Sequence, residues 1–174
     1  MKLYLLSAIL LISSCQKATD KEYAIVKTDE NIEGLVLKGV DKHYDWSFFS
    51  GAIVDGDIPA YNDSTLSDEV FISQYLATRL NLKVGNNFQM WFVMEQPRFR
   101  KFKVAGIYET SLQEFDKTYA FADIKHIRRL NNWKDDQISG YEMMISDFSK
   151  LDEVTEELKE ITSSHFFDDG SRLK

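Results

Sequence analysis

The stretch EVFISQYLATRLNLKVGNNFQMWF, residues 69–92, decides the expected order of the central elements. Its first five letters alternate as a strand does, and Ser73 is a favourable N-cap for a helix over about residues 74–80. The letters KVGNN then supply a turn into a second strand, which has three apolar residues on one face: Phe88, Met90 and Phe92. Residues 69–92 therefore predict a strand, a helix, a turn and a strand.

Further strands are expected on both sides of this stretch. Residues 23–27 and 34–40 are rich in Val, Leu and Ile and are bounded by turn-forming residues, so both predict strands. Between them and residue 69, Asp45 is placed to cap one helical turn with three expected core residues: Trp46, Phe48 and Phe49. Downstream, residues 99–110 predict a long strand with three residues on one side: Phe102, Val104 and Tyr108.

The last third of the chain adds strands and two longer helices. Residues 118–122 and 138–146 predict strands, and Asp123 is an expected cap for a helix over residues 124–133. That helix has an apolar stripe of Ile124, Ile127 and Leu130, and its outward residues are expected to be Lys125, His126, Arg128 and Arg129. A final acidic helix begins near Ser149 and has the stripe Leu151, Val154, Leu158 and Ile161. This mixed order predicts an α+β fold with a mixed or antiparallel sheet and two or three helices.

The N-terminus has the pattern of a signal peptide that precedes a lipidated cysteine. Lys2 is followed by a largely apolar run over residues 3–12, shorter than the about 20 residues of a membrane-spanning helix. The letters ISSC, residues 12–15, resemble the bacterial lipobox, whose cysteine is acylated. We therefore expect the following organisation: a lipoprotein-type signal peptide over residues 1–14, lipidation at Cys15, a tether over residues 15–22, a domain over residues 23–163 and a polar tail over residues 164–174. An ordinary unpaired cysteine is the alternative.

The chain is acidic. Its 28 Asp and Glu side chains against 21 Lys and Arg give a formal net charge of −7 over 174 residues. Because nucleic-acid binding needs a basic surface, no nucleic-acid partner is expected. A hydrophobic content of 44% favours one folded domain with a sizeable core, and the single cysteine excludes an internal disulfide.

No residue pattern predicts catalysis or a metal site. His43, His126 and His165 lie far apart in the sequence, and none has a second nitrogen or thiolate ligand at metal-binding spacing. The acidic loop that starts at Asp55 lacks two required features of an EF-hand, because the positions of a ligand and of the glycine are occupied by Pro59 and Ala60. We therefore expect no enzymatic activity, no cofactor and no bound metal.

Three segments together resemble a known family. They are EGLVLKGVDKHYDWSFF (33–49), GDIPAYNDSTLSDEVFISQYLATRLNLKVGNNFQMWF (56–92) and RKFKVAGIYETSLQEFDKTYAFADIKHIRRLNNW (100–133). In order and spacing they look like the periplasmic core domain of the MacB and lipoprotein-releasing (LolC/LolE-like) ABC transporter permeases, in the version found in Bacteroidetes. The resemblance covers roughly residues 23–162.

The resemblance implies a MacB-like periplasmic core domain that performs no chemistry itself. In such permeases the domain couples ATP-driven movements of the membrane helices to the capture or hand-over of a lipoprotein or other substrate. By comparison with the family pattern, we expect a lipoprotein-type signal in place of the first transmembrane helix and the start of the domain, and we expect the later helices to be missing. We therefore expect a partial domain with one open sheet edge and no directly bound nucleotide.

Three functional hypotheses follow from the resemblance and the signal. The first is a non-catalytic module on the periplasmic side of the bacterial envelope, lipid-anchored to the inner or outer membrane, that binds lipoprotein cargo or ABC transporter subunits. The second is a truncated permease fragment with little independent activity. The third is a small-ligand-binding lipoprotein that shares only the fold.

The expected protein-binding surface is a loop after the long strand. Leu112 and Phe115 would form an apolar anchor with Glu114 and Asp116 at its rim. The expected neighbour of this loop is a basic strand face made of Arg100, Lys101 and Lys103. Packing of Phe115 back onto the core is an equally weighted alternative.

Overall fold

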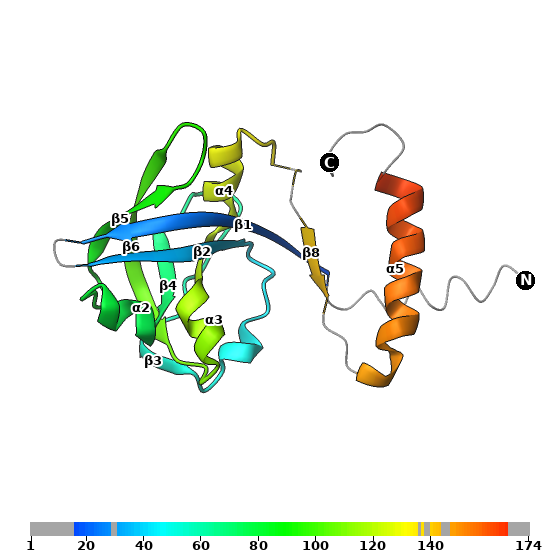
Figure 1. The fold of residues 1–174 in the computed structure, drawn as a ribbon, viewed down its shortest axis with the longest axis horizontal. Coiled ribbons are helices and arrows are strands. Elements are labelled where there is room, and N and C mark those ends of the chain that lie inside the picture. The colour runs from blue at the N-terminus through cyan, green and yellow to red at the C-terminus, as the bar shows by residue number, and fades with distance from the viewer. Residues whose placement is uncertain (1–15, 29–30, 136, 138–139, 144–146, 167–174) are drawn as a thin grey trace, which may run out of the picture.

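The computed structural model describes residues 16–28, 31–135, 137, 140–143 and 147–166 (Figure 1). Its strands are β1 (Gln16–Lys27), β2 (Ile32–Val40), β3 (Ile53–Gly56), β4 (Glu69–Ser73), β5 (Asn87–Phe92), β6 (Arg98–Tyr108), β7 (Tyr119–Asp123) and β8 (Gly140–Met143). Its helices are η1 (Trp46–Phe49), α2 (Gln74–Arg79), α3 (Gln113–Thr118), α4 (Ile124–Asn131), η2 (Phe148–Lys150) and α5 (Leu151–Phe166). The predicted α+β class is confirmed, with 4 α-helices within these residues in place of the two or three expected.

The central part of the sheet closes into a barrel. Hydrogen-bonded neighbours follow the order β2, β7, β4, β6, β5 and β1, and β1 pairs back onto β2. In this ring, β2–β7 and β4–β6 are parallel and the other pairs are antiparallel. Over residues 24–26, β1 is paired on both sides, so the open edge expected beside a missing N-terminal strand does not lie there. Instead β3 adds to β6 beyond the end of β5, and β8 pairs with the first residues of β1 outside the ring.

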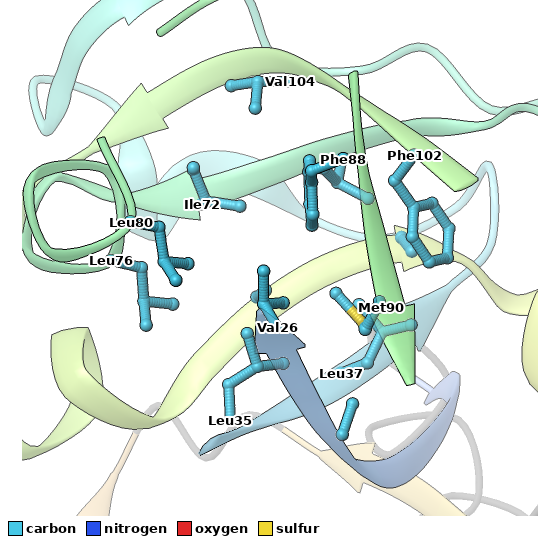
Figure 2. Close-up of a cluster of buried hydrophobic side chains, with 14 of the residues drawn as sticks. Val26, Leu35, Leu37, Ile72, Leu76, Leu80, Phe88, Met90, Phe102 and Val104 are labelled. Atoms are coloured by element: carbon cyan, nitrogen blue, oxygen red, sulfur yellow. The ribbon is translucent and has the colours of Figure 1, made fainter. Parts of the chain in front are cut away.

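The main hydrophobic core fills the inside of the barrel. Inward residues of neighbouring strands, such as Val26, Leu37 and Met90, are fully buried there, as are Leu76 and Leu80 from the α2 region (Figure 2). The strands alternate as expected, because Phe88, Met90 and Phe92 are buried on β5 while the residues between them are exposed. The barrel interior is therefore occupied by packed side chains.

A second cluster of aromatic side chains covers the outside of β4, β6 and β7. Phe71, Tyr108 and Phe121 point away from the barrel interior and pack against Phe49 of η1. We predicted Tyr108 on the same side as Phe102 and Val104, and this prediction is wrong: Phe102 and Val104 belong to the barrel core. The reason is an irregularity in β6, where Val70 pairs with Val104 but Phe71 pairs with Gly106, which shifts the alternation by one residue.

Local capping explains where two of the helices begin. The Ser73 hydroxyl accepts a hydrogen bond from the backbone N–H of Leu76 at 3.1 Å, which caps α2 as predicted. Asp123 caps α4 by accepting from the N–H of Lys125 at 3.0 Å. The predicted stripe of α4 is confirmed, because Ile124, Ile127 and Leu130 are all buried.

Two further expectations differ from the structure, and several others concern residues outside the described ranges. Residues 16–22, expected to be a tether, form the first half of β1 and continue directly into the barrel. His126 was expected to face outward, but it is buried and its ring lies 4.7 Å from that of Phe102, because the barrel end covers that side of α4 as well. The signal peptide, Cys15 and residues 167–174 of the tail are outside the described residues.

Candidate protein-binding surface

The structure separates the predicted binding residues into two groups. The segment with Leu112, Glu114, Phe115 and Asp116 forms the start of α3, just beyond the end of β6 at Tyr108. Arg100, Lys101 and Lys103 lie in the first half of β6, so that Lys103 is about 16 Å from Tyr108 along the strand. Strand alternation also places Arg100 on the opposite face from Lys101 and Lys103. The basic residues therefore form no single face that continues into α3.

Phe115 packs against the aromatic cluster instead of standing free. Its ring centroid lies 5.1 Å from that of Tyr119, 5.6 Å from that of Phe48 and 6.2 Å from that of Tyr108. Its side chain is half-buried. The alternative considered for Phe115, packing onto the core, is thus what the structure places there. The segment 113–118 is a short helix and not the projecting loop that we expected.

Asp116 is buried and organises the turn before α3. Its carboxylate accepts hydrogen bonds from the Thr110 hydroxyl at 2.6 Å and from the Thr110 backbone N–H at 3.1 Å. The hydroxyl of Ser73 donates to the backbone carbonyl of Asp116, which ties α3 to the start of α2. Asp116 is therefore a residue of the scaffold, because its charged oxygens are used inside the chain.

Four predicted or neighbouring side chains are exposed at the surface around α3. Leu112, the residue before α3, is 55% exposed and Phe48 of η1 is 49% exposed. Leu112 is the N-cap residue of α3, and Phe115, three residues later, contacts Phe48 with the ring centroids 5.6 Å apart. Glu114 forms an ion pair with Lys117 at 3.1 Å. We call Phe48, Leu112, Glu114 and Lys117 the η1–α3 surface: an apolar centre with charged groups beside it.

Two exposed apolar features were missed from the sequence. Phe48 was expected in the core with Trp46 and Phe49, but only Phe49 is fully buried. The outer wall of the barrel also has an exposed group on β1, on β6 and at β5 and its end, here called the wall patch: Tyr23, Ile25, Trp91, Val93 and Phe99. The alternation of these strands can be recognised in the sequence. Because both faces of the strands have apolar residues, the alternation does not show which face is exposed to solvent.

Chemical groups in the interior serve the fold. Within the described residues, no group of three or more His, Cys, Asp or Glu side chains could hold a metal ion. Tyr61 is buried beside β4 and β7, and its hydroxyl donates to the carbonyl of Glu69 at 3.1 Å. Burial, with the nearby carboxylate of Asp123, raises the pKa of Tyr61 well above its ordinary value. In the part of the chain that the structure covers, no helix has the length and hydrophobicity to span a membrane.

Comparison with solved structures identifies the fold. The extracellular domain of the noncanonic ABC-type transporter YknZ from Gram-positive bacteria aligns over 100% of this chain and 89% of its own, with a TM-score of 0.60 and 13% identity. This chain has a MacB-like periplasmic domain fold. The periplasmic region of MacB from Actinobacillus actinomycetemcomitans aligns over 91% of this chain and 74% of its own, with a TM-score of 0.49 and 14% identity.

The MacB-like periplasmic domain fold confirms the expectation from the three quoted segments. No protein-family model matches the chain, and no curated protein matches it in sequence. At 13% identity, the likeness to YknZ shows the fold and gives no information about which exposed residues of this chain bind a partner. The η1–α3 surface and the wall patch must therefore be judged from their geometry.

Proposed function

We propose that this protein is a non-catalytic interaction module on the periplasmic side of the envelope, related to ABC transporter permeases for lipoprotein release or export. It binds a protein partner, either a transporter subunit or a lipoprotein, through the η1–α3 surface. The observation that carries the proposal is the likeness to the extracellular domain of a transporter, which extends over the whole chain.

The η1–α3 surface supports a protein as the partner. Phe48 and Leu112 offer exposed apolar area, and the Phe48 ring is held in place by contact with Phe49 and Phe115. A rigid aromatic residue beside charged groups is typical of the centre of a protein interface. The side chains packed inside the barrel leave its interior to the hydrophobic core, which favours a surface partner over an enclosed small ligand.

Attachment to the membrane through an acylated Cys15 belongs to the same proposal. β1 begins at Gln16, directly after that residue. A lipid on Cys15 would hold β1, and with it the barrel, close to the membrane surface, where a permease subunit lies.

The proposal is tested by affinity capture from envelope extracts after chemical crosslinking. The bait is the full chain, and it is compared with Leu112→Glu and with Lys134→Glu. Lys134 is an exposed control residue three positions after the end of α4, a helix that lies at the opposite end of the barrel from α3 (Figure 1). Wild type and the Lys134 variant should capture the same transporter subunit or lipoprotein, identified by mass spectrometry, and Leu112→Glu should lose it. Equal capture by all three proteins would show that the η1–α3 surface is not the contact.

A further inference from the structure

The wall patch forms a continuous apolar strip across three strands. Ile25 of β1 pairs with Trp91 of β5, and Trp91 pairs with Phe99 of β6. The ring centroids of Trp91 and Phe99 are 5.0 Å apart. One row further along, the N–H of Val93 donates to the carbonyl of Tyr23 at 3.1 Å. The five side chains are between 39% and 72% exposed, although the alternate residues of β1 and β5 belong to the barrel core.

The side chains on this face are of the kinds found at the interface of a lipid bilayer. Tyr23 and Trp91 each combine a large ring with a polar tip, which suits the boundary between acyl chains and headgroups. The exposed Lys27 on β1 and Lys101 on β6 follow the patch on the same face. Within the part of the chain that the structure describes, neither lysine has an ion-pair partner. A lysine in this position can lay its stem along the apolar area and bring its ammonium group to a lipid phosphate.

The position of the wall patch relative to Cys15 favours the membrane as its occupant. β1 starts at Gln16, directly after Cys15, and continues as one long strand to Tyr23 and Ile25 (Figure 1). At about 3.3 Å per residue, these two residues lie about 26–33 Å from Cys15 along the strand. An attachment at Cys15 therefore holds one end of β1 at the bilayer, and the patch lies further along the same strand.

We infer that the wall patch rests on the lipid bilayer, with β1 lying along the membrane surface. The apolar strip enters the boundary between headgroups and acyl chains, and Lys27 and Lys101 contact phosphates of anionic lipids. Two acids are also close in sequence: Glu95 lies beyond Val93, and Asp29, outside the described residues, follows Lys27. The apolar area is therefore the main source of binding, and the lysines add to it. The inference builds on the attachment at Cys15 proposed above.

This orientation turns the η1–α3 surface away from the bilayer. In the ring of six strands, β5 lies opposite β7 and β1 lies opposite β4. The wall patch is on β1, on β5 and at the start of β6, whereas Phe49 of η1 packs against Phe71 of β4 and Phe121 of β7 on the outside of the barrel. A chain that rests on the wall patch therefore presents the proposed binding surface to proteins beyond the membrane.

Tryptophan quenching in vesicles tests the inference. Cys15 is the only cysteine of the chain, so the full chain, made by cell-free synthesis to keep this thiol free, is coupled there to a maleimide lipid. The vesicles contain phosphatidylethanolamine and phosphatidylglycerol, with or without brominated acyl chains. With Trp46 and Trp133 replaced by phenylalanine, the emission of Trp91 should shift to shorter wavelength and be quenched by the brominated lipids. Chemical coupling makes this result independent of whether cells acylate Cys15.

A matched chain places the probe on the opposite side of the barrel. In it all three tryptophans are replaced by phenylalanine, and Phe48→Trp puts the only tryptophan on the η1–α3 surface. Its emission should be unaffected by the brominated lipids. Circular dichroism confirms the fold of both chains before coupling.

Two variants keep the test independent of folding. Gly34 pairs with Ile25, and a Cβ atom at Gly34 would meet nothing within 4 Å, so Gly34→Glu adds an acid beside the patch without removing any of its residues. It should abolish the quenching of Trp91 while the melting temperature stays constant, and Gly34→Ala should keep the quenching. Lys101→Glu should weaken it.

Three results would overturn the inference: an unquenched Trp91 in the coupled chain, equal quenching at positions 91 and 48, or the same quenching with and without Gly34→Glu. An unquenched Trp91 together with dimers in sedimentation equilibrium would assign the patch to a second copy instead. The proposed function is tested separately, because loss of partner capture by Leu112→Glu does not depend on the quenching of Trp91.

Discussion

Replacing Phe115 and Leu112 separately by alanine distinguishes the scaffold from the contact surface. Both residues were candidates for partner binding, but the structure places them differently. Phe115 packs against aromatic rings of η1, β6 and β7, whereas Leu112 is 55% exposed at the start of α3. We expect Phe115→Ala to lower stability, and Leu112→Ala to leave stability unchanged and reduce partner capture.

The magnitude follows from the burial of each side chain. Removing a fully buried phenylalanine costs about 3–5 kcal/mol, and since Phe115 is half-buried we expect about 2 kcal/mol. For a chain of 174 residues, each kcal/mol lowers the melting temperature by about 2–4 °C, which predicts a decrease of about 4–8 °C. Leu112→Ala should stay within about 0.5 kcal/mol of the wild type, as exposed substitutions usually do.

Urea unfolding monitored by circular dichroism measures both values, and tryptophan fluorescence gives a second signal. Trp46 reports on the same cluster, because its ring lies 5.7 Å from that of Phe49 and 5.6 Å from that of Phe121. An unchanged unfolding midpoint for Phe115→Ala, together with lost partner capture, would refute this reasoning and make Phe115 a contact residue.

Three other predictions concern the anchor, the turns and the pH dependence. Metabolic fatty-acid labelling should mark the wild type, and Cys15→Ser should lose both the label and membrane retention; an unlabelled wild type would end the lipoprotein interpretation. Gly85→Val should lower the free energy of unfolding by about 1–2 kcal/mol, because Gly85 has a φ of +86° with open space around it. Gly56→Ala should lower it more in the same urea unfolding assay, because the added Cβ would lie 2.3 Å from the Ala105 carbonyl oxygen. Equal losses of stability for the two variants would contradict this. Burial lowers the pKa of His126 below its ordinary 6.5, so the neutral form is favoured in the folded chain. The stability that comes from this residue should be complete above about pH 6.5 and should decrease at lower pH. In urea unfolding, the stability of His126→Gln should depend less on pH than that of the wild type.

Local features of the fold could be predicted because neighbouring residues determine them. Ser73 and Asp123 cap the helices that follow them, and the alternation over residues 88–92 matches the pleat of β5. The family resemblance extended this local order to a fold. Barrel closure could not be derived, because it depends on which strands pair, as when residues 24–26 meet residues 90–92.

The errors in the candidate site have physical causes. The start of α3 was missed because Leu112, at its N-cap position, offers no side chain that can accept a hydrogen bond. Tyr108 was assigned to the wrong face because an irregularity at Ala105 and Gly106 shifts the alternation of β6; a glycine inside a strand is a sequence signal for such an irregularity, and the prediction did not use it. Phe48 and Phe49 are chemically identical neighbours, and only the packing of η1 on the barrel decides which of them is buried.

Site-specific photo-crosslinking in living cells tests the central claim most directly. A photo-reactive residue at position 112 of the full chain should form a product with an ABC transporter subunit or a lipoprotein, and the same probe at Lys134 should not. Absence of any protein product at position 112, or the same products from both positions, would contradict the account of this chain as a protein-binding module.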